Sequence, residues 1–181
     1  MKKKLLSALL CAAMVASLVI GCGQKEPAVE EPAATEEADE ENYETGDASL
    51  DNTRNQDEIG ENELLVVSFG TSFNDNRRLT IGAIEEKIEA AFPEYAVRRG
   101  FTSQIIIDHV MSRDNVKIDN VAEALDRAVA NGVKNLVVQP TLLMNGIEYE
   151  ELTTTLAEYA DSFESVTVGE PLLTSDEDFQ K

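Results

Sequence analysis

Residues 64–72 read LLVVSFGTS, an apolar run that ends abruptly at a glycine, a threonine and a serine. The run contains no alternation of apolar and polar positions, which is typical of a strand buried on both faces of a sheet. Residues 95–101, 135–139 and 165–169 are also predicted to be strands, the last two followed closely by a proline. We therefore expect four short strands.

Helical patterns separate these strands. They cover residues 74–92, 103–111, 119–131 and 147–160. Strands that alternate with helices imply right-handed crossovers and a parallel sheet. The sequence therefore predicts an α/β fold, a three-layer sandwich in which a four-stranded parallel sheet is flanked by helices. Ligands of such sheets bind beyond the carboxyl ends of the strands.

The first predicted helix has an apolar side. Asn74 or Asp75 is expected to cap its N-terminus, and Pro93 is expected to end it. Asp119 is expected to cap the third predicted helix in the same way. The side chains expected on the inner face of the first helix are Leu79, Ile81, Ile84, Ile88 and Ala91.

An export signal is predicted at the N-terminus. Residues 2–4 are lysines and residues 5–20 are apolar, a length that suits a signal peptide better than a membrane-spanning helix. The run ends in VIGC at residues 19–22, which resembles the lipobox of bacterial lipoproteins. The resemblance implies that residues 1–21 are removed and that Cys22 receives a lipid, which would anchor the protein outside the cytoplasmic membrane. A plain secretory signal that contains a cysteine is the alternative.

Residues 22–63 are predicted to be a tether. They are rich in Glu, Asp, Ala and Pro and nearly free of large apolar side chains, so burial cannot offset the entropy lost on ordering them. We expect an acidic, disordered tether between the lipid and a folded domain at residues 64–181. An acidic tail that scavenges metal ions is the alternative.

The composition excludes several classes of function. The net charge is -20, and no basic stripe exists to neutralise phosphates, so nucleic acid is not an expected partner. The two cysteines, Cys11 and Cys22, precede the predicted domain, and His109 is the single histidine. Most zinc sites and most Ser-His or Cys-His catalytic sites are therefore excluded within the domain.

Four short motifs lie at predicted strand ends. They are SFGTS at residues 68–72, GFTS at residues 100–103, NGIEYE at residues 145–150 and GEPLL at residues 169–173. In their order and spacing they resemble the anaerobic sirohydrochlorin cobaltochelatases, which are class II tetrapyrrole chelatases in the same fold group as ferrochelatase. The likeness runs from about residue 64 to the last residue.

The resemblance implies two similar α/β halves with a tetrapyrrole in the cleft between them, of which this chain covers the first. Residues 174–179 have the pattern of a helix that has barely begun, so we expect a truncated gene or a fragment. A self-standing half that pairs with a second chelatase half, or forms a homo-oligomer, is the alternative. The family inserts Co²⁺, as a substrate, into a macrocycle that must lose two pyrrole protons. No permanently bound cofactor is implied.

The general base and the metal-binding histidines of the family belong to GHG-like and GDH-like loops of the second half. A comparison of the two halves places Phe69 at the position of the base and Glu148 at the position of the GDH-like histidine. We therefore expect no catalytic residue in this chain. Glu148 is a candidate metal ligand, and an ordinary role in the first turn of a helix is its alternative.

The resemblance also suggests which residues line the tetrapyrrole site. The candidates are Phe69, Gly70, Thr71, Ser72, Asn145, Gly146, Glu148 and Tyr149. Phe69 suits stacking against a flat macrocycle. Thr71 and Ser72, with nearby backbone N–H groups, suit a propionate or acetate group of the ring. Helix capping is the alternative for that pair, and core packing is the alternative for Tyr149 and Met144.

Three further residues have two interpretations each. Arg98 and Arg99 are candidate partners of ring carboxylates, but neighbouring residues of a strand point to opposite faces, so a surface salt bridge is expected for one of them. His109 is expected to be a partly buried helix residue, with a ligand role as the alternative.

Two functions from different classes follow. The first is an enzyme, namely the N-terminal half of an exported sirohydrochlorin cobaltochelatase of anaerobic cobalamin biosynthesis, inactive alone. The second is a lipid-anchored protein that binds haem, another tetrapyrrole or metal ions outside the cytoplasm without catalysis. The export signal motivates the second, because the precursors of cobalamin are made in the cytoplasm. A structural domain that has lost its ligand is a third interpretation.

Overall fold

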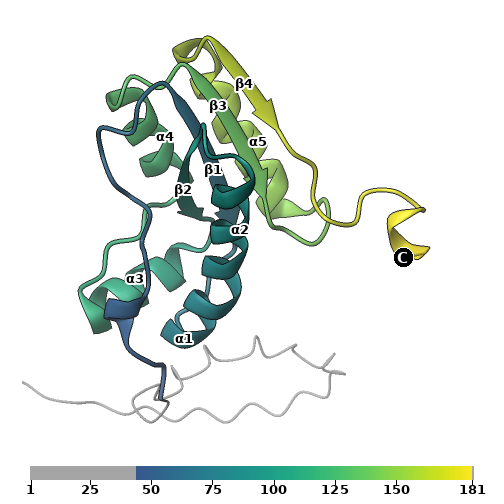
Figure 1. Cartoon of the computed structure of the whole chain (residues 1–181). Coiled ribbons are helices and arrows are strands. Elements are labelled where there is room, and N and C mark those ends of the chain that lie inside the picture. Colours follow the sequence, from purple (N-terminus) through teal and green to yellow (C-terminus); the bar gives the residue numbers. More distant parts are fainter. Residues whose placement is uncertain (1–43, 181) are drawn as a thin grey trace, which may run out of the picture. The chain divides into compact units, whose positions relative to one another are not determined.

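The computed structural model describes residues 44–180, which contain one four-stranded sheet (Figure 1). The strands are β1 (Asn62–Ser68), β2 (Ala96–Phe101), β3 (Asn135–Pro140) and β4 (Ser165–Val168), and all neighbouring pairs are parallel. Their order is β2-β1-β3-β4. The predicted α/β fold with a four-stranded parallel sheet is confirmed. The continuous apolar run belongs to β1, whose residues pack into core clusters on both faces of the sheet.

Helices connect the strands. The helical elements are η2 (Ala48–Leu50), α1 (Asn74–Asn76), η3 (Arg77–Gly82), α2 (Ala83–Ala91), α3 (Gln104–Asp114), α4 (Val121–Ala130), α5 (Ile147–Tyr159), η4 (Ala160–Ser162) and η5 (Asp178–Gln180). Three of them, α1, η3 and α2, follow one another directly and make a single helical segment between β1 and β2. Its middle part, η3, is a π-helix, a rare geometry that is frequent near functional sites.

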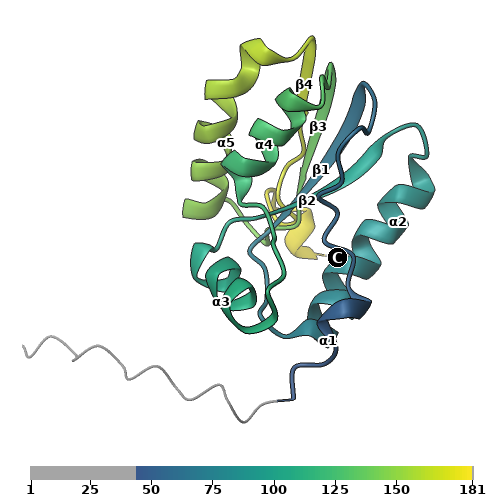
Figure 2. The same ribbon diagram turned by 90° about the vertical axis from the view of Figure 1, so that its left-hand side faces the viewer.

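The helices lie on both faces of the sheet, with α4 and α5 on one face and α2 on the other (Figure 2). Leu65 and Val138 pack with Leu125 of α4 and Leu152 of α5. The opposite face of β1 and β2 packs against α2, and its buried residues are Leu64, Val66 and Val97. The two cores therefore share β1 as their common wall.

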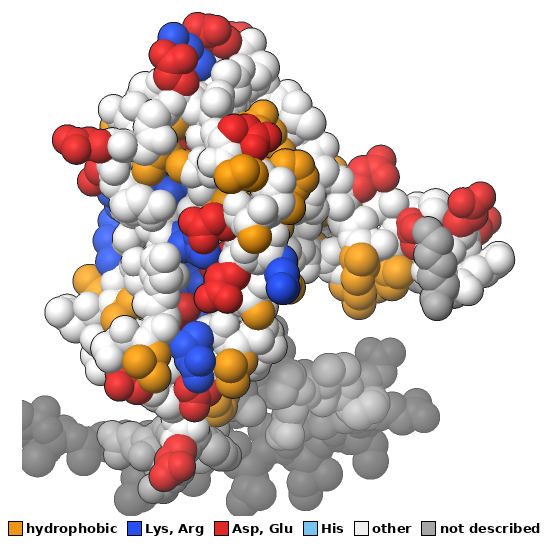
Figure 3. All heavy atoms as spheres, in the orientation of Figure 1, with side chains coloured by type: hydrophobic (Ala, Val, Ile, Leu, Met, Phe, Trp, Pro, Cys, Tyr) orange, Lys and Arg blue, Asp and Glu red, His pale blue; other side chains and the backbone are white. Residues whose placement is uncertain are grey.

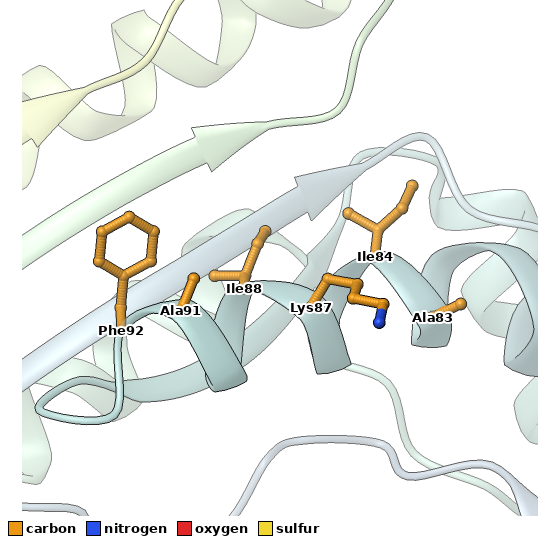
Figure 4. A pocket seen from close by; sticks show the side chains of 6 residues that line it. All are labelled: Ala83, Ile84, Lys87, Ile88, Ala91 and Phe92. Carbon is orange, nitrogen blue, oxygen red and sulfur yellow. The ribbon is translucent and has the colours of Figure 1, made fainter.

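The face of the sheet that packs against α2 is covered over only part of its width. Val137 and Gln139 of β3 are half-buried, and Thr167 of β4 is exposed. Beside this open part, α2 presents an apolar groove (Figure 4), lined by Ala83, Ile84, Lys87, Ile88, Ala91 and Phe92. Figure 3 shows hydrophobic side chains on the surface over this helix.

The inner face of the first helical segment is only partly apolar: Ile81 and Ile88 pack against core residues as predicted, but the prediction was wrong for the rest of this face. Arg77 and Glu85 are fully buried, whereas Leu79 and Ile84 are 60% and 45% exposed. The N-cap is Phe73 rather than an asparagine or an aspartate. The physical reason is a cluster of buried charges that occupies the space between this segment and β2.

Asp119 is not the cap of α4. The cap is Asn120, whose side chain accepts a hydrogen bond from the backbone N–H of Glu123, while Glu123 accepts one from the backbone N–H of Asn120. Asp119 is fully buried and instead accepts hydrogen bonds from Arg127 at 2.7 and 3.2 Å. The pairing of this buried carboxylate therefore takes precedence over a capping role.

The predicted boundary between tether and domain at residue 64 was also wrong. Residues 45–57, here called the strap, run along β2 before the chain enters β1 (Figure 1). The backbone carbonyl of Arg54 accepts a hydrogen bond from the backbone N–H of Arg99 in β2, and the side chain of Arg54 is 4% exposed. The strap therefore covers the free edge of the sheet, which otherwise exposes unpaired backbone groups.

The remaining N-terminal predictions lie outside the described residues. These are the signal at residues 1–21, lipidated Cys22 and the tether at residues 22–43. Between residues 44 and 180, the helices are all too short or too polar to span a bilayer.

Glu63, the second residue of β1, is a buried carboxyl group. It is 0% exposed, and within the described part of the chain neither of its carboxylate oxygens has a hydrogen-bond partner. Burial raises the pKa of Glu63 from 4.5 to about 7, although the nearby Arg98 guanidinium opposes this change. At neutral pH the folded state therefore resists ionisation of this group.

Glu63→Gln is expected to stabilise the domain in a pH-dependent way. Well below pH 4.5 the carboxyl group is protonated in both the folded and the unfolded state, so it does not destabilise the fold. Above that pH the unfolded state ionises more readily, and the stability lost to this group grows until the pH passes about 7. Denaturation at pH 8 should show a free energy of unfolding higher by up to about 3 kcal/mol, and this gain should shrink as the pH falls. The exposed Glu94→Gln is the matched control. Equal stability of the Glu63→Gln protein and the parent from pH 5 to 8 would contradict this account.

Candidate functional site

The loops that follow the four strands meet at the carboxyl edge of the sheet. Backbone N–H groups of Thr102 and Ser103, after β2, donate to the carbonyls of Ser68, the last residue of β1, and of Phe69 at 2.9 and 3.3 Å. The segment after β3 is bonded to the segment after β4, because Leu172 N–H donates to Leu142 O at 3.0 Å and Leu173 N–H to Leu143 O at 2.8 Å. Segments far apart in the sequence therefore form one surface.

The loop after β1 passes close over a buried ring. Gly70 has a φ of +100°, and a Cβ atom at this position would lie 2.5 Å from Cδ2 of Phe101. Phe101 is fully buried at the end of β2. A glycine is therefore required in the SFGTS motif for two reasons: the left-handed backbone conformation and the close approach to the ring of Phe101.

Two arginines, Arg77 and Arg113, donate hydrogen bonds to this loop. Arg77 donates from Nη1 to the carbonyl of Thr71 at 3.2 Å and from Nη2 to Oδ1 of Asn74 at 2.6 Å. Arg113 of α3 donates from Nη2 to the carbonyl of Ser72 at 2.6 Å. Within the loop, the hydroxyl oxygen of Thr71 accepts a hydrogen bond from the backbone N–H of Phe73 at 3.3 Å. The loop is thus fixed by charged donors rather than by packing alone.

The loop after β3 places the second predicted group of residues. Asn145 is exposed, Gly146 is the N-cap of α5, and Glu148 lies half-buried in its first turn. A Cβ atom at Gly146 would lie 3.6 Å from Oε2 of Glu148, so this carboxylate lies beside the start of the helix. Tyr149 packs against the core and its hydroxyl donates to the carbonyl of Gly169 at 3.3 Å. The tyrosine therefore joins two of the edge segments.

Large apolar side chains are exposed along this edge. Phe69 is 50% exposed, Met144 is 51% exposed and Leu172 is 70% exposed. The full set at the strand ends is Phe69, Phe73, Ile105, Leu143, Met144, Ile147 and Leu172. Figure 3 shows hydrophobic side chains on the segment that follows β4. An exposed apolar surface with a few polar groups is typical of a ligand-binding or partner-binding face.

Beneath the edge lies a cluster of buried charges that the sequence did not predict. Arg99 donates to Glu85 through Nε and Nη2, both at 2.7 Å, and to Asp51 through Nη1 at 2.7 Å. Arg77 donates from Nε to the same Asp51 carboxylate at 2.6 Å. Arg54 pairs with Glu85 at 3.2 Å. Three segments, namely the strap, the helix after β1 and β2, therefore meet through ion pairs.

The charges of this cluster stabilise one another. Burial alone would raise the pKa of Asp51, but hydrogen bonds and charge from Arg99 and Arg77 outweigh it and keep the pKa below its usual value. Burial raises the pKa of Glu85, although Arg99 and Arg54 oppose the change. Burial would lower the pKa of Arg99, but Glu85 and Asp51 outweigh it and raise the pKa. Removing one partner would leave a buried charge uncompensated, which is costly.

Both arginines of β2 are buried, so the expected surface salt bridge is not found. Arg98 and Arg99 are each 1% exposed. Arg98 donates to the backbone carbonyls of Arg54 and Gln56 in the strap, and the guanidinium of Arg99 lies 5.7 Å from the ring centroid of Phe101. The hydrogen-bond partners described here for the two side chains belong to the strap and α2, rather than to the carboxyl edge.

The structure separates the remaining candidates. His109 is half-buried on α3, which follows β2, whereas Glu148 begins α5, which follows β3, and β1 lies between those two strands. Met144 is exposed at the edge. Among residues 44–180, no three His, Cys, Asp or Glu side chains are grouped closely enough to hold a metal ion.

Comparisons with known proteins add a family. Residues 62–181 match the cobalt chelatase (CbiK) family. The chain is 37% identical over 116 residues to the sirohydrochlorin cobaltochelatase of Salmonella typhimurium, which covers 64% of this chain and 44% of that protein. The chain thus spans less than half the length of this relative. The matched residues include the whole sheet but not the strap.

Gly70→Ala is expected to destabilise the domain more than Gly60→Ala. Both glycines have positive φ, +100° and +89°, but a Cβ atom at Gly60 has nothing within 4 Å. Backbone strain should cost about 1 kcal/mol at either position, and the contact with Phe101 should add about 2 kcal/mol at Gly70. Chemical denaturation of the two variants measures the difference. Equal losses of stability would show that the loop does not pass over the ring as described.

Proposed function

The chain belongs to the cobalt chelatase (CbiK) family, and on that premise we propose that it supplies one wall of a sirohydrochlorin cobaltochelatase site. A flat tetrapyrrole lies against the carboxyl edge, and a second chelatase half closes the site from the other side. Co²⁺ is a substrate: it enters the macrocycle while two pyrrole N–H protons leave. The second half supplies the groups that accept these protons and deliver the ion.

The exposed apolar edge is the observation that carries this proposal. Flat macrocycles bind to apolar and aromatic side chains that a few polar groups orient. Phe69, Met144 and Leu172 come from three different strand ends and are each at least 50% exposed. Packing them against a ring would remove this surface from water. Ligand binding would therefore explain why these apolar side chains are exposed, although exposed apolar surface lowers solubility.

The polar groups of the edge suggest how the ring is oriented. The first turn of α5 carries Glu148 and Glu150, whose charge disfavours a carboxylate of the ring at that helix start. The loop at Thr71 and Ser72 contains no carboxylate, and it lies against Arg113, whose charge is also paired with Asp114 at 2.7 Å. We therefore assign the ring carboxylates to the loop after β1. In the assembled protein, we expect Glu148 to face the side from which Co²⁺ is delivered to the ring.

The single histidine makes the second half necessary in this proposal. Proton removal from a pyrrole and transient binding of Co²⁺ both suit imidazole. His109 is the chain's single histidine, and it lies half-buried on α3. Phe69, at the position that the resemblance assigns to the base, can contact a ring but cannot accept a proton. This half therefore binds and orients the tetrapyrrole.

A second candidate function is a lipid-anchored tetrapyrrole-binding protein. The lysines at residues 2–4, the apolar residues 5–20 and Cys22 favour it, because they are expected to place the chain outside the cytoplasm. In this candidate the same apolar edge holds haem or another tetrapyrrole, and no metal is inserted. A second copy of the chain would close the site.

Complementation tests the enzyme proposal. The chain alone, with Co²⁺ and sirohydrochlorin under anaerobic conditions, should metallate the ring no faster than buffer. Adding the remaining part of the Salmonella relative as a separate polypeptide should produce insertion of Co²⁺. The change in the absorption spectrum of sirohydrochlorin measures this insertion. Insertion by the chain alone would contradict the proposal, because it would place the proton acceptor in this half.

Titration with haem and with sirohydrochlorin separates the two candidates. The enzyme proposal predicts that Phe69→Ala weakens sirohydrochlorin binding about threefold to tenfold through lost ring contact. Val129→Ala, which removes a 41% exposed apolar side chain on α4, is the matched control and should change nothing. Tight haem binding, with no insertion of Co²⁺ into sirohydrochlorin even when the second half is present, would favour the carrier. Equal effects of the two variants would exclude the carboxyl edge as the site.

A further inference from the structure

The strap contacts the loop of the candidate site as well as the edge of the sheet. The backbone N–H of Asp75 donates to the carbonyl of Thr45 at 2.8 Å, and Nδ2 of Asn74 donates to the carbonyl of Gly46 at 3.1 Å. Five residues further along the strap, the side chain of Asp51 is 1% exposed. The strap thus approaches the loop after β1 both from its backbone and through a buried carboxylate.

Asp51 reaches the loop through two arginines. Arg77 donates from Nε to the carboxylate of Asp51, and it donates two further hydrogen bonds, to the carbonyl of Thr71 at 3.2 Å and to Oδ1 of Asn74 at 2.6 Å. Arg99 binds the same carboxylate and lies over the ring of Phe101, the ring against which Gly70 packs. Both paths end in the loop.

The π-helical turn makes the first path feasible. Arg77 is the first residue of η3 and is fully buried. A π-helical turn carries one residue more than an α-helical turn and so changes the direction of neighbouring side chains. A buried guanidinium needs an anionic partner, and a carboxylate from outside the family-matched residues provides it.

We propose that Asp51 is a positioning residue, and the strap a positioning element, for the ligand-binding loop at residues 69–74. The match to the family begins at residue 62, so this element lies outside the residues that match the family. That the loop contacts a tetrapyrrole rests on the function proposed above. The positioning itself does not, because it concerns contacts of the free chain. The segment through which this chain is expected to be tethered is thereby bonded directly to the site.

Asp51→Asn and Arg54→Gln make a matched pair for the test. Both remove a buried charge of the strap, but Arg54 pairs with Glu85 and Glu89, whereas Asp51 pairs with Arg77 and Arg99. Amide hydrogen exchange of the free protein should become roughly tenfold to hundredfold faster at residues 71–77 in Asp51→Asn. Arg54→Gln should leave those amides unchanged relative to β1, whatever its effect on global stability.

Sirohydrochlorin titration gives the second readout. Asp51→Asn should bind more weakly and Arg54→Gln should bind as the parent does. Equal acceleration of exchange in both variants, or none at residues 71–77 in Asp51→Asn, would overturn the positioning role. A parent protein that binds no tetrapyrrole would instead contradict the proposed function, while the exchange result still decides the role of the strap.

A further variant covers the case in which Asp51→Asn does not fold. Gly46→Ala removes no buried charge, but its Cβ atom would lie 2.3 Å from Cγ of Asp75, at a φ of +89°. The Asp75 side chain is 56% exposed and must turn away from this Cβ atom, so the contact between the strap and the start of the helix should loosen and exchange at residues 71–77 should accelerate. Gly60→Ala, with the same φ and open space, is its control. Equal exchange in these two variants would also overturn the proposal.

Discussion

The bidentate ion pair between Arg99 and Glu85 is the interaction on which the rest of this structure depends. It joins the central helix after β1 to the edge strand β2, with both hydrogen bonds at 2.7 Å and both side chains fully buried. Two such groups require further partners, because isolated charges inside a protein are strongly unfavourable. Asp51 of the strap pairs with Arg99, and Arg54 of the strap pairs with Glu85. Arg77, from the same helical segment as Glu85, pairs in turn with Asp51. The strap and the loop after β1 are ordered as a result.

The carboxyl edge follows from this arrangement. The parallel sheet gathers four strand ends on one side, and the cluster of charges fixes the first of their loops from below. The exposed face of the loop is then free to present Phe69 and its neighbours, because its polar backbone groups are already bonded on the inner side. A rigid, apolar wall of this kind suits a ligand that is flat and itself rigid. The match to the cobalt chelatase family and the exposed apolar edge are independent observations, and both favour a tetrapyrrole ligand.

The sequence predicted the sheet well and the buried charges poorly. The run LLVVSFGTS identified the central strand and the loop, because a continuous apolar segment before a glycine has few other interpretations. The predicted inner face of the next helix was only partly right, because counting apolar positions cannot detect Arg77 and Glu85, whose partners lie 26 and 14 residues away. One signal was available in the acidic segment: Arg54 is the single basic residue between Lys25 and Arg77. A lone arginine among so many carboxylates is more easily explained by a specific partner than by a disordered tether.

The position of a bound tetrapyrrole tests the central claim most directly, namely that this chain binds its ligand with the carboxyl edge of the sheet. Ferric haem is flat and paramagnetic, so it broadens the amide signals of nearby residues in a two-dimensional NMR spectrum. The account predicts broadening at residues 69–73 and 143–149 and little change over α2. Broadening confined to the apolar groove at Ile84, Ile88 and Phe92, with sharp signals at the carboxyl edge, would contradict it.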